Sequence, residues 1–184
     1  MELADLAAEL GADERTLRRA VADGMIRCER LSPRRRRVDE DERRYAVDHW
    51  SLLAKLRQAL RTERNVRLAV VYGSVARGED TQRSDVDLLV SLSKDRPNVA
   101  VKLAVRLEGA LGRRVDVVRL ERVWETAPFL LLRVVEEGRV VLDRDREWVR
   151  LRERRGEVAR RAGRAHVARR RRAQASVREL CEEA

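Results

Sequence analysis

The sequence predicts an α+β fold in which a small mixed β-sheet with helices lies between a helical N-terminal segment and a long basic C-terminal helix. Apolar residues recur at helical spacing near the N-terminus, and the strongest strand-length apolar runs fall in the middle of the chain. Arginine then dominates the last segment. We therefore divide the chain into residues 1–45, a linking helix over 46–63, a sheet-containing domain over 64–143 and a helical segment over 144–184.

Composition narrows the class of protein. The 184 residues suffice for one good core or two small domains, and with 3% aromatic residues that core must consist of Leu, Val and Ala. The formal net charge is +10, but 39 of the 42 basic residues are arginine, a bias that GC-rich coding produces without any nucleic-acid binding. Residues 1–45 hold 11 arginines and 11 acidic residues, whereas residues 144–184 hold 14 arginines and 7 acidic residues, so the basic part is the C-terminal segment.

Cysteine usage and hydropathy indicate a cytoplasmic protein. Cys28 and Cys181 lie far apart without CxxC spacing, so we expect neither a structural disulfide nor a zinc site. No apolar run reaches the length of a membrane span, and the first residues carry acids where a signal peptide carries bases. The sequence therefore predicts a soluble protein without a membrane partner.

The first 45 residues combine two short helices with a basic hairpin. Leu3, Leu6 and Leu10 have helical spacing, Asp13 is a suitable N-cap for a second helix, and Gly24 ends that helix. Two short extended runs then flank Ser32-Pro33. This is the layout of a winged helix-turn-helix, and the stretch LADLAAELGADERTLRRAVADGMI resembles the DNA-reading domain of MerR-like regulators.

That resemblance implies operator DNA as a partner and, because helix-turn-helix proteins usually bind paired half-sites, a homo-oligomer. The DNA contacts would come from the second helix and from the hairpin, through Arg15, Arg18, Arg19, Arg34, Arg35, Arg36 and Arg37.

Four strands are predicted in the middle of the chain, at residues 66–72, 84–92, 114–120 and 139–143. We expect one helix over 97–111 with Pro97 at an early position, and another over 121–138 that restarts at Pro128. From residue 144 onward we expect one long arginine-rich helix with weak points at Gly156 and Gly163.

A Gly-Ser pair directly after the first of these strands suggests a phosphate-binding turn. Gly73 lets the backbone approach a phosphate and can take positive φ, and Ser74 adds a hydroxyl group. The residues after it can open a short helix, whose free N–H groups favour an anion. Arg77 lies within that turn and would contact a phosphate or brace the loop.

Acidic residues occupy the next two strands. Asp85 and Asp87 follow Ser84 at positions that share one face of a strand. Two carboxylates on one face of an apolar strand are costly unless something compensates them, and a divalent metal such as Mg²⁺ does so. If the strand that carries Asp116 lies beside them, this third carboxylate would join the metal site and take a proton from an attacking hydroxyl group.

Each of these features is weak alone, since a Gly-Ser pair is common, a DxD is often a cap or turn, and a lone arginine is often a surface ion-pair partner. Their conjunction resembles the minimal nucleotidyltransferases, a branch of the polymerase-beta-like superfamily, over residues 64–143. The matching pattern is Gly73-Ser74, ten residues, Asp85-x-Asp87 and a later Asp116, with Ala76-Arg77-Gly78 also present.

The resemblance implies a mixed sheet with helices on one face. It also implies Mg²⁺-dependent transfer of a nucleoside monophosphate, AMP above all, from ATP or another NTP to an acceptor hydroxyl, with pyrophosphate leaving. Asp85, Asp87 and Asp116 would be the catalytic and metal-binding residues, and the nucleotide would be bound by Gly73, Ser74, Arg77 and Ser84.

The motif binds the donor nucleotide, so it leaves the acceptor open. Members of the family often act as antitoxins that attach AMP to a tyrosine of an all-helical HEPN toxin, a ribonuclease, while others modify transfer RNA or inactivate aminoglycosides. Three functions therefore stay open at this point: an enzyme that modifies or neutralises a HEPN-type toxin, a DNA-binding regulator whose transferase domain senses nucleotides or is inactive, and a toxin that modifies transfer RNA. The basic C-terminal segment favours an RNA or protein partner.

Overall fold

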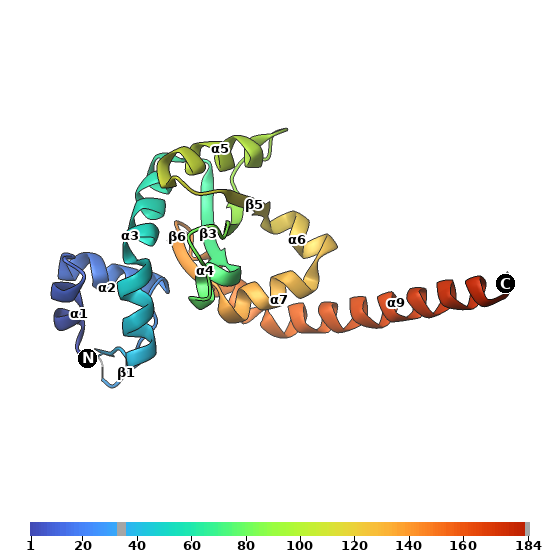
Figure 1. Ribbon diagram of the computed structural model, residues 1–184, viewed down its shortest axis with the longest axis horizontal. Coiled ribbons are helices and arrows are strands. Elements are labelled where there is room, and N and C mark those ends of the chain that lie inside the picture. Colours follow the sequence, from blue (N-terminus) through green and yellow to red (C-terminus); the bar gives the residue numbers. More distant parts are fainter. Residues whose placement is uncertain (33–35, 183–184) are drawn as a thin grey trace.

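The structure is a computed structural model that describes residues 1–32 and 36–182, with side chains up to residue 170 (Figure 1). Its elements, in chain order, are α1 (Leu3–Glu9), α2 (Glu14–Asp23), β1 (Glu29–Arg30), β2 (Arg36–Arg37), α3 (Glu40–Thr62), β3 (Val66–Tyr72), α4 (Gly73–Arg77), β4 (Val86–Leu92), α5 (Val99–Leu111), β5 (Val115–Arg119), α6 (Leu120–Thr126), α7 (Pro128–Glu137), β6 (Arg139–Asp143), α8 (Glu147–Glu153) and α9 (Arg155–Glu182).

The N-terminal helices share their core with the sheet. The Asp13 side chain caps α2 by accepting a hydrogen bond from the backbone N–H of Thr16 at 3.0 Å. β1 and β2 form a two-residue antiparallel hairpin, and the predicted DNA-contacting Arg34 and Arg35 lie outside the described residues. Buried side chains of α1 and α2, such as Leu6 and Leu17, belong to the same apolar cluster as those of α3 and of one sheet face.

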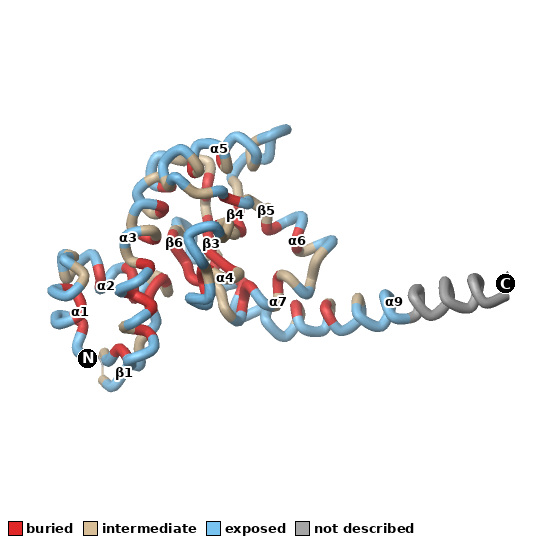
Figure 2. The backbone as a smooth tube through the Cα atoms, in the orientation of Figure 1, coloured by how far each residue is buried: buried red, intermediate tan, exposed pale blue. Residues whose placement is uncertain are grey.

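The predicted mixed sheet is confirmed, with strand order β5-β4-β3-β6. β3 pairs antiparallel with β4 and β6, whereas β4 and β5 run parallel. Helices cover both faces, because alternate strand residues are buried in different clusters: Val71 and Leu88 pack with α3 and α5, and Val70 and Leu89 pack with α6 and α7. The implied single layer of helices is therefore wrong, and Figure 2 shows buried residues along the strands between the two layers.

Two predicted boundaries shift by two residues. β4 begins at Val86, so Asp85 lies just before the strand rather than on it. α5 begins at Val99 with Asn98 as its N-cap, so Pro97 precedes the helix instead of opening it. The restart at Pro128 is confirmed, since this proline occupies the first turn of α7.

The C-terminal segment is two helices rather than one, and the break falls at Arg154. Gly156 and Gly163, the predicted weak points, both lie inside α9. α8 is fixed separately because the Asp143 carboxylate accepts hydrogen bonds from the first backbone N–H groups of this helix, and because Trp148 is buried against the sheet.

α9 leaves the body of the protein as a long arm (Figure 1). Its first turns pack on α7 through the buried Val158 and Ala162, and from Gly163 to residue 170 its side chains are mostly exposed. In the described part of the chain no helix is long and apolar enough to cross a membrane.

Candidate functional site

The turn between β3 and α4 requires a glycine. Gly73 has a φ of +71°, and a Cβ atom built there would lie 2.1 Å from Oδ2 of Asp87. No side chain other than hydrogen fits at this position. The sequence suggested that Gly73 lets a phosphate approach the backbone, and the structure places the carboxylate of Asp87 directly against the same turn.

Asp87 and Asp116 are direct neighbours across two strands. They are register partners in the parallel pair of β4 and β5, so their side chains project from the same face of the sheet. Asp87 is half-buried and Asp116 is exposed. The predicted adjacency of these two carboxylates is present in the structure.

Negative charge accumulates around this pair. Burial, followed by the nearby Asp116 and Asp85 carboxylates, raises the pKa of Asp87 above its ordinary value, and Arg77 opposes this shift. Tyr72 is the last residue of β3. Burial, followed by the carboxylates of Asp87 and Asp116, raises the pKa of its hydroxyl group. The site thus has the electrostatics of a group of carboxylates that lacks a sufficient counter-charge.

Asp85 lies near the pair and has a cationic neighbour of its own. Its Oδ1 is 3.8 Å from Nε of Arg114, and its side chain is 43% exposed. Among the described side chains, those of residues 1–32 and 36–170, no three His, Cys, Asp or Glu are grouped closely enough to hold a metal ion. The donor chemistry nevertheless fits Mg²⁺, which prefers hard carboxylate oxygens, and the crowded carboxylates would be relieved by a cation.

The other residues predicted to bind nucleotide, Ser74, Arg77 and Ser84, lie on the turn or on the loop that follows it. Arg77 donates to Glu79 through Nε at 2.7 Å and to Glu137 of α7 through Nη1 at 3.0 Å, so it braces the loop, one of its two predicted roles. Ser84 accepts a hydrogen bond on Oγ from the backbone N–H of Thr81 at 3.0 Å. Ser74 is half-buried in α4 next to Gly73.

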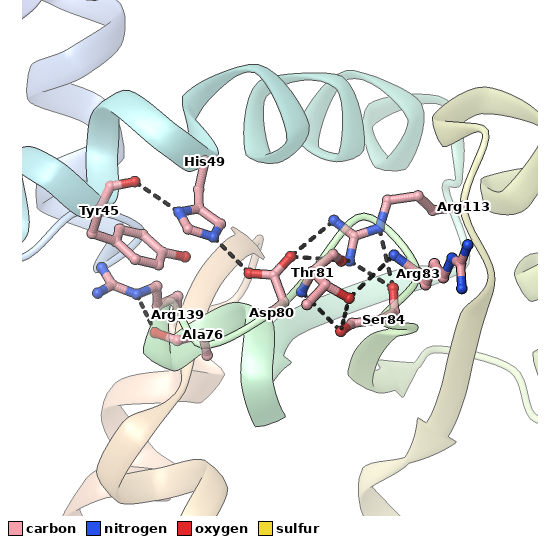
Figure 3. A network of polar contacts seen from close by, with 9 residues as sticks. All are labelled: Tyr45, His49, Ala76, Asp80, Thr81, Arg83, Ser84, Arg113 and Arg139. Carbon is pink, nitrogen blue, oxygen red and sulfur yellow. Dashed lines mark hydrogen bonds and ion pairs between the residues drawn. The ribbon is translucent and has the colours of Figure 1, made fainter.

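A buried carboxylate that the sequence did not single out fixes the loop between α4 and β4. Asp80 is held on one oxygen by Nε2 of His49 at 2.7 Å and on the other by both terminal nitrogens of Arg113 at 3.0 Å (Figure 3). Its side chain is only 6% exposed. Burial alone would raise the pKa of Asp80, but the hydrogen bonds from His49 and Arg113 outweigh it and hold that pKa below its ordinary value.

Arg113 extends this contact to the residue before the DxD motif. Its guanidinium group donates to the backbone carbonyl of Ser84 at 2.6 Å and to that of Thr81 at 3.1 Å. Segment 80–84 is therefore tied at both ends to one cation, which sets where the chain enters Asp85 and β4. No local pattern marks this set, because its members come from α3, a loop and the α5–β5 turn.

α3 supports the same loop from the other side. The Tyr45 ring stacks on His49 with a centroid distance of 4.3 Å, and a Cβ atom at Gly78 would lie 3.1 Å from that ring. The guanidinium group of Arg139 covers Tyr45 at 3.3 Å and donates through Nε to the carbonyl of Ala76 at 2.7 Å (Figure 3). The Gly-Ser turn and the loop after it thus rest on α3 and β6.

A cavity of about 720 Å³ lies between the start of α5, the end of β5 and helices α6 and α7. Its lining includes Val117 and Val118, which follow Asp116 on β5, together with Asn98 before α5 and Leu130 of α7. This space therefore lies along the outer strand of the sheet, and Asp85, Asp87 and Asp116 are not part of its lining.

The mixed sheet, the glycine turn and the paired strand carboxylates together define a nucleotidyltransferase. Residues 54–147 match the family model described as polymerase beta, nucleotidyltransferase. The chain belongs to this family, and its N-terminal segment lies outside the matched residues.

Similar proteins agree with that assignment. A putative protein adenylyltransferase of Methanocaldococcus jannaschii is 35% identical over 78 residues, which are 42% of this chain and 81% of the relative. The protein adenylyltransferase MntA of Thermococcus cleftensis is 40% identical over 70 residues, 37% of this chain and 70% of the relative.

Solved structures share the fold. A toxin-antitoxin crystal structure with AMP-PNP has a chain that aligns with a TM-score of 0.55 at 21% identity, covering 66% of this chain and 98% of that one. A crystal structure of the toxin-antitoxin MntA-HepT aligns with a TM-score of 0.52 at 19% identity, covering 68% of this chain and 98% of that one.

We predict that Asp87→Asn stabilises the metal-free protein, because it removes the charge that burial and two neighbouring carboxylates disfavour. An acid with a raised pKa costs stability once it ionises, so the advantage of the variant should grow as the pH rises above the ordinary value of 3.8. Thermal unfolding in EDTA from about pH 4 to about pH 8 measures it.

The control for this prediction is Asp48→Asn, which removes an exposed carboxylate of α3 and should leave the melting temperature unchanged at every pH. Added Mg²⁺ should stabilise the wild type and not Asp87→Asn. A variant less stable than the wild type across this pH range would contradict the crowded-carboxylate account.

We further predict that Asp80→Asn destabilises the protein by about 2 kcal/mol, because it leaves buried donors of His49 and Arg113 without a charged acceptor. Transferase activity should fall about tenfold through displacement of Asp85 and Asp87. Chemical denaturation and steady-state kinetics measure the two effects.

The control is Glu79→Gln, which changes a 62% exposed carboxylate on the same loop and should alter stability by less than about 0.5 kcal/mol. Equal effects of both substitutions would refute the bracing role of Asp80.

Proposed function

We propose that this protein transfers AMP from ATP, with Mg²⁺, to a hydroxyl group of an acceptor protein, and that the acceptor is a HEPN-type toxin which it neutralises. The observation that carries the proposal is the in-register pair Asp87 and Asp116 beside the Gly73 turn. Hard oxygen ligands next to a phosphate-accessible backbone suit a magnesium–triphosphate donor.

The residues take distinct roles in this proposal. Gly73 and Ser74 hold the triphosphate on the turn, and the carboxylates of Asp85, Asp87 and Asp116 bind the cation that accompanies it. Bound Mg²⁺ supplies charge neutralisation on the phosphates and makes the acceptor hydroxyl more acidic. Asp116, the exposed member of the pair, takes the hydroxyl proton while the acceptor oxygen bonds to the α-phosphorus and the bond to pyrophosphate breaks.

A protein acceptor is favoured by the relatives. The two described above carry the name protein adenylyltransferase, and this chain spans 81% and 70% of their lengths. The two solved structures with the same fold are of toxin-antitoxin pairs, one of them with AMP-PNP. These names support an acceptor protein of the toxin type over transfer RNA or a small molecule.

A second function, operator binding, is favoured by the N-terminal helices and hairpin. Arg15, Arg18 and Arg19 are exposed on α2, and Arg37 is exposed at the end of the hairpin. We propose that this winged helix-turn-helix contacts DNA, in a form that pairs two copies of the chain. This role is compatible with transferase activity because its residues lie outside the 54–147 family match.

The transfer proposal predicts that the purified protein, with labelled ATP and Mg²⁺, attaches AMP to a tyrosine of an all-helical HEPN partner encoded beside it. Intact-mass analysis of the partner locates the label. Asp87→Asn combined with Asp116→Asn should lower the rate at least about a hundredfold, while Asp48→Asn should retain it. Label in transfer RNA instead of protein would overturn the protein acceptor, and an unchanged rate in the double variant would overturn the catalytic role.

The operator proposal predicts salt-sensitive binding of the full chain to its own promoter, because phosphate contacts release counterions. Fluorescence anisotropy with promoter and scrambled duplexes measures it. Replacing Arg36 and Arg37 with alanine should weaken promoter binding, and the exposed Arg64→Ala should not. Equal affinity for both duplexes would argue against a sequence-reading role.

A further inference from the structure

A second polar cavity, separate from the carboxylates, lies between α2 and α3 and measures about 290 Å³. Four of its lining residues are arginines, and none is acidic. Polar neighbours and a partly apolar floor complete the lining, which consists of Arg15, Thr16, Arg19, Ala20, Met25, Trp50, Ala54, Arg57, Gln58 and Arg61.

The four arginines of the lining form two pairs, one on each helix. Arg15 and Arg19 are four residues apart on α2, and Arg57 and Arg61 are four residues apart on α3, so each pair occupies one side of its helix. Two pairs of cations around one cavity repel each other, and this repulsion opposes the packing of α2 on α3.

Most of this charge has no counter-charge among the described side chains. Arg57 pairs with Asp23, whereas Arg15, Arg19 and Arg61 have no ion-pair partner among the residues that the structure describes. The exposed Arg18, also on α2 but not in the lining, pairs with Glu14 at 2.7 Å. Three of the four arginines that line the cavity, Arg15 and Arg19 of α2 and Arg61 of α3, are thus uncompensated.

Arg57 is held in place at the wall of the cavity. Its side chain is 14% exposed, one terminal nitrogen contacts Asp23, and Nη1 is buried without a hydrogen-bond partner. A guanidinium group that is already fixed loses little side-chain entropy when an anion binds in the cavity.

We propose that this cavity binds a small phosphate-bearing anion: inorganic phosphate, pyrophosphate or the terminal phosphates of a nucleotide. Guanidinium groups match phosphate oxygens with paired N–H donors, and cations from two helices surround the space. The anion replaces the missing counter-charge and bridges α2 to α3. α3 also carries His49, the hydrogen-bond partner of Asp80. Such a bridge therefore connects the N-terminal helices to the helix that supports the loop before Asp85.

The test is calorimetric titration of the full-length protein with pyrophosphate in buffer that contains EDTA, so that no metal promotes binding at the carboxylates. The wild type should bind saturably. Arg15→Ala combined with Arg61→Ala should weaken binding at least tenfold, and both residues are exposed, so the fold should persist. The matched control is Arg64→Ala, an exposed arginine of equal charge outside the cavity, which should bind like the wild type.

Titrations with phosphate and with ATP identify the source of the anion, because the natural ligand class binds most tightly and is weakened in the same double variant. Circular dichroism verifies that the double variant is folded, and the two single variants replace it otherwise. The proposal is overturned by the absence of saturable binding of all three anions, or by equal weakening in Arg64→Ala. It is also overturned if a short DNA duplex alone binds and is alone affected by the double variant.

Discussion

The buried guanidinium group of Arg139 is the contact on which the arrangement of this protein depends. It is 3% exposed, it pairs with both carboxylate oxygens of Glu42, and it also donates to the carbonyls of Ala76 and Met25. One side chain of β6 thereby joins α3, the Gly-Ser helix α4 and the end of the N-terminal helices. Removing one partner of such a pair leaves an uncompensated buried charge, at a cost of about 3–5 kcal/mol.

The loop that precedes Asp85 is positioned by these contacts. The Tyr45 ring lies between Arg139 and the His49 ring, and His49 is hydrogen-bonded to Asp80. This unbroken series of contacts fixes the loop before Asp85 to α3. Such rigidity has a purpose, since crowded carboxylates repel one another and would separate on a mobile support. The same helix carries the arginine-lined cavity, and an anion there would act on the helix that orients the loop.

Local patterns sufficed to predict the strands and the placement of Gly73, Asp87 and Asp116, because alternation along strands and a glycine after a buried strand are properties of neighbouring residues. They could not reveal Asp80, whose partners are 31 and 33 residues away in the sequence. The C-terminal segment was predicted as one helix because the contacts that fix α8 separately, the Asp143 side chain and the buried Trp148, are not visible in the local pattern. The orientation of Asp85 toward Arg114 likewise depends on a tertiary neighbour.

The central claim is that the carboxylates beside the Gly73 turn hold a metal–nucleotide donor. The most direct measurement is a crystal structure of the protein with Mn²⁺ and a non-hydrolysable ATP analogue, in which anomalous scattering locates the metal. We predict a peak at about 2.0–2.3 Å from carboxylate oxygens of both Asp87 and Asp116, with the phosphates on the Gly73–Ser74 turn. A metal bound elsewhere, or a nucleotide bound away from this turn, would contradict the account.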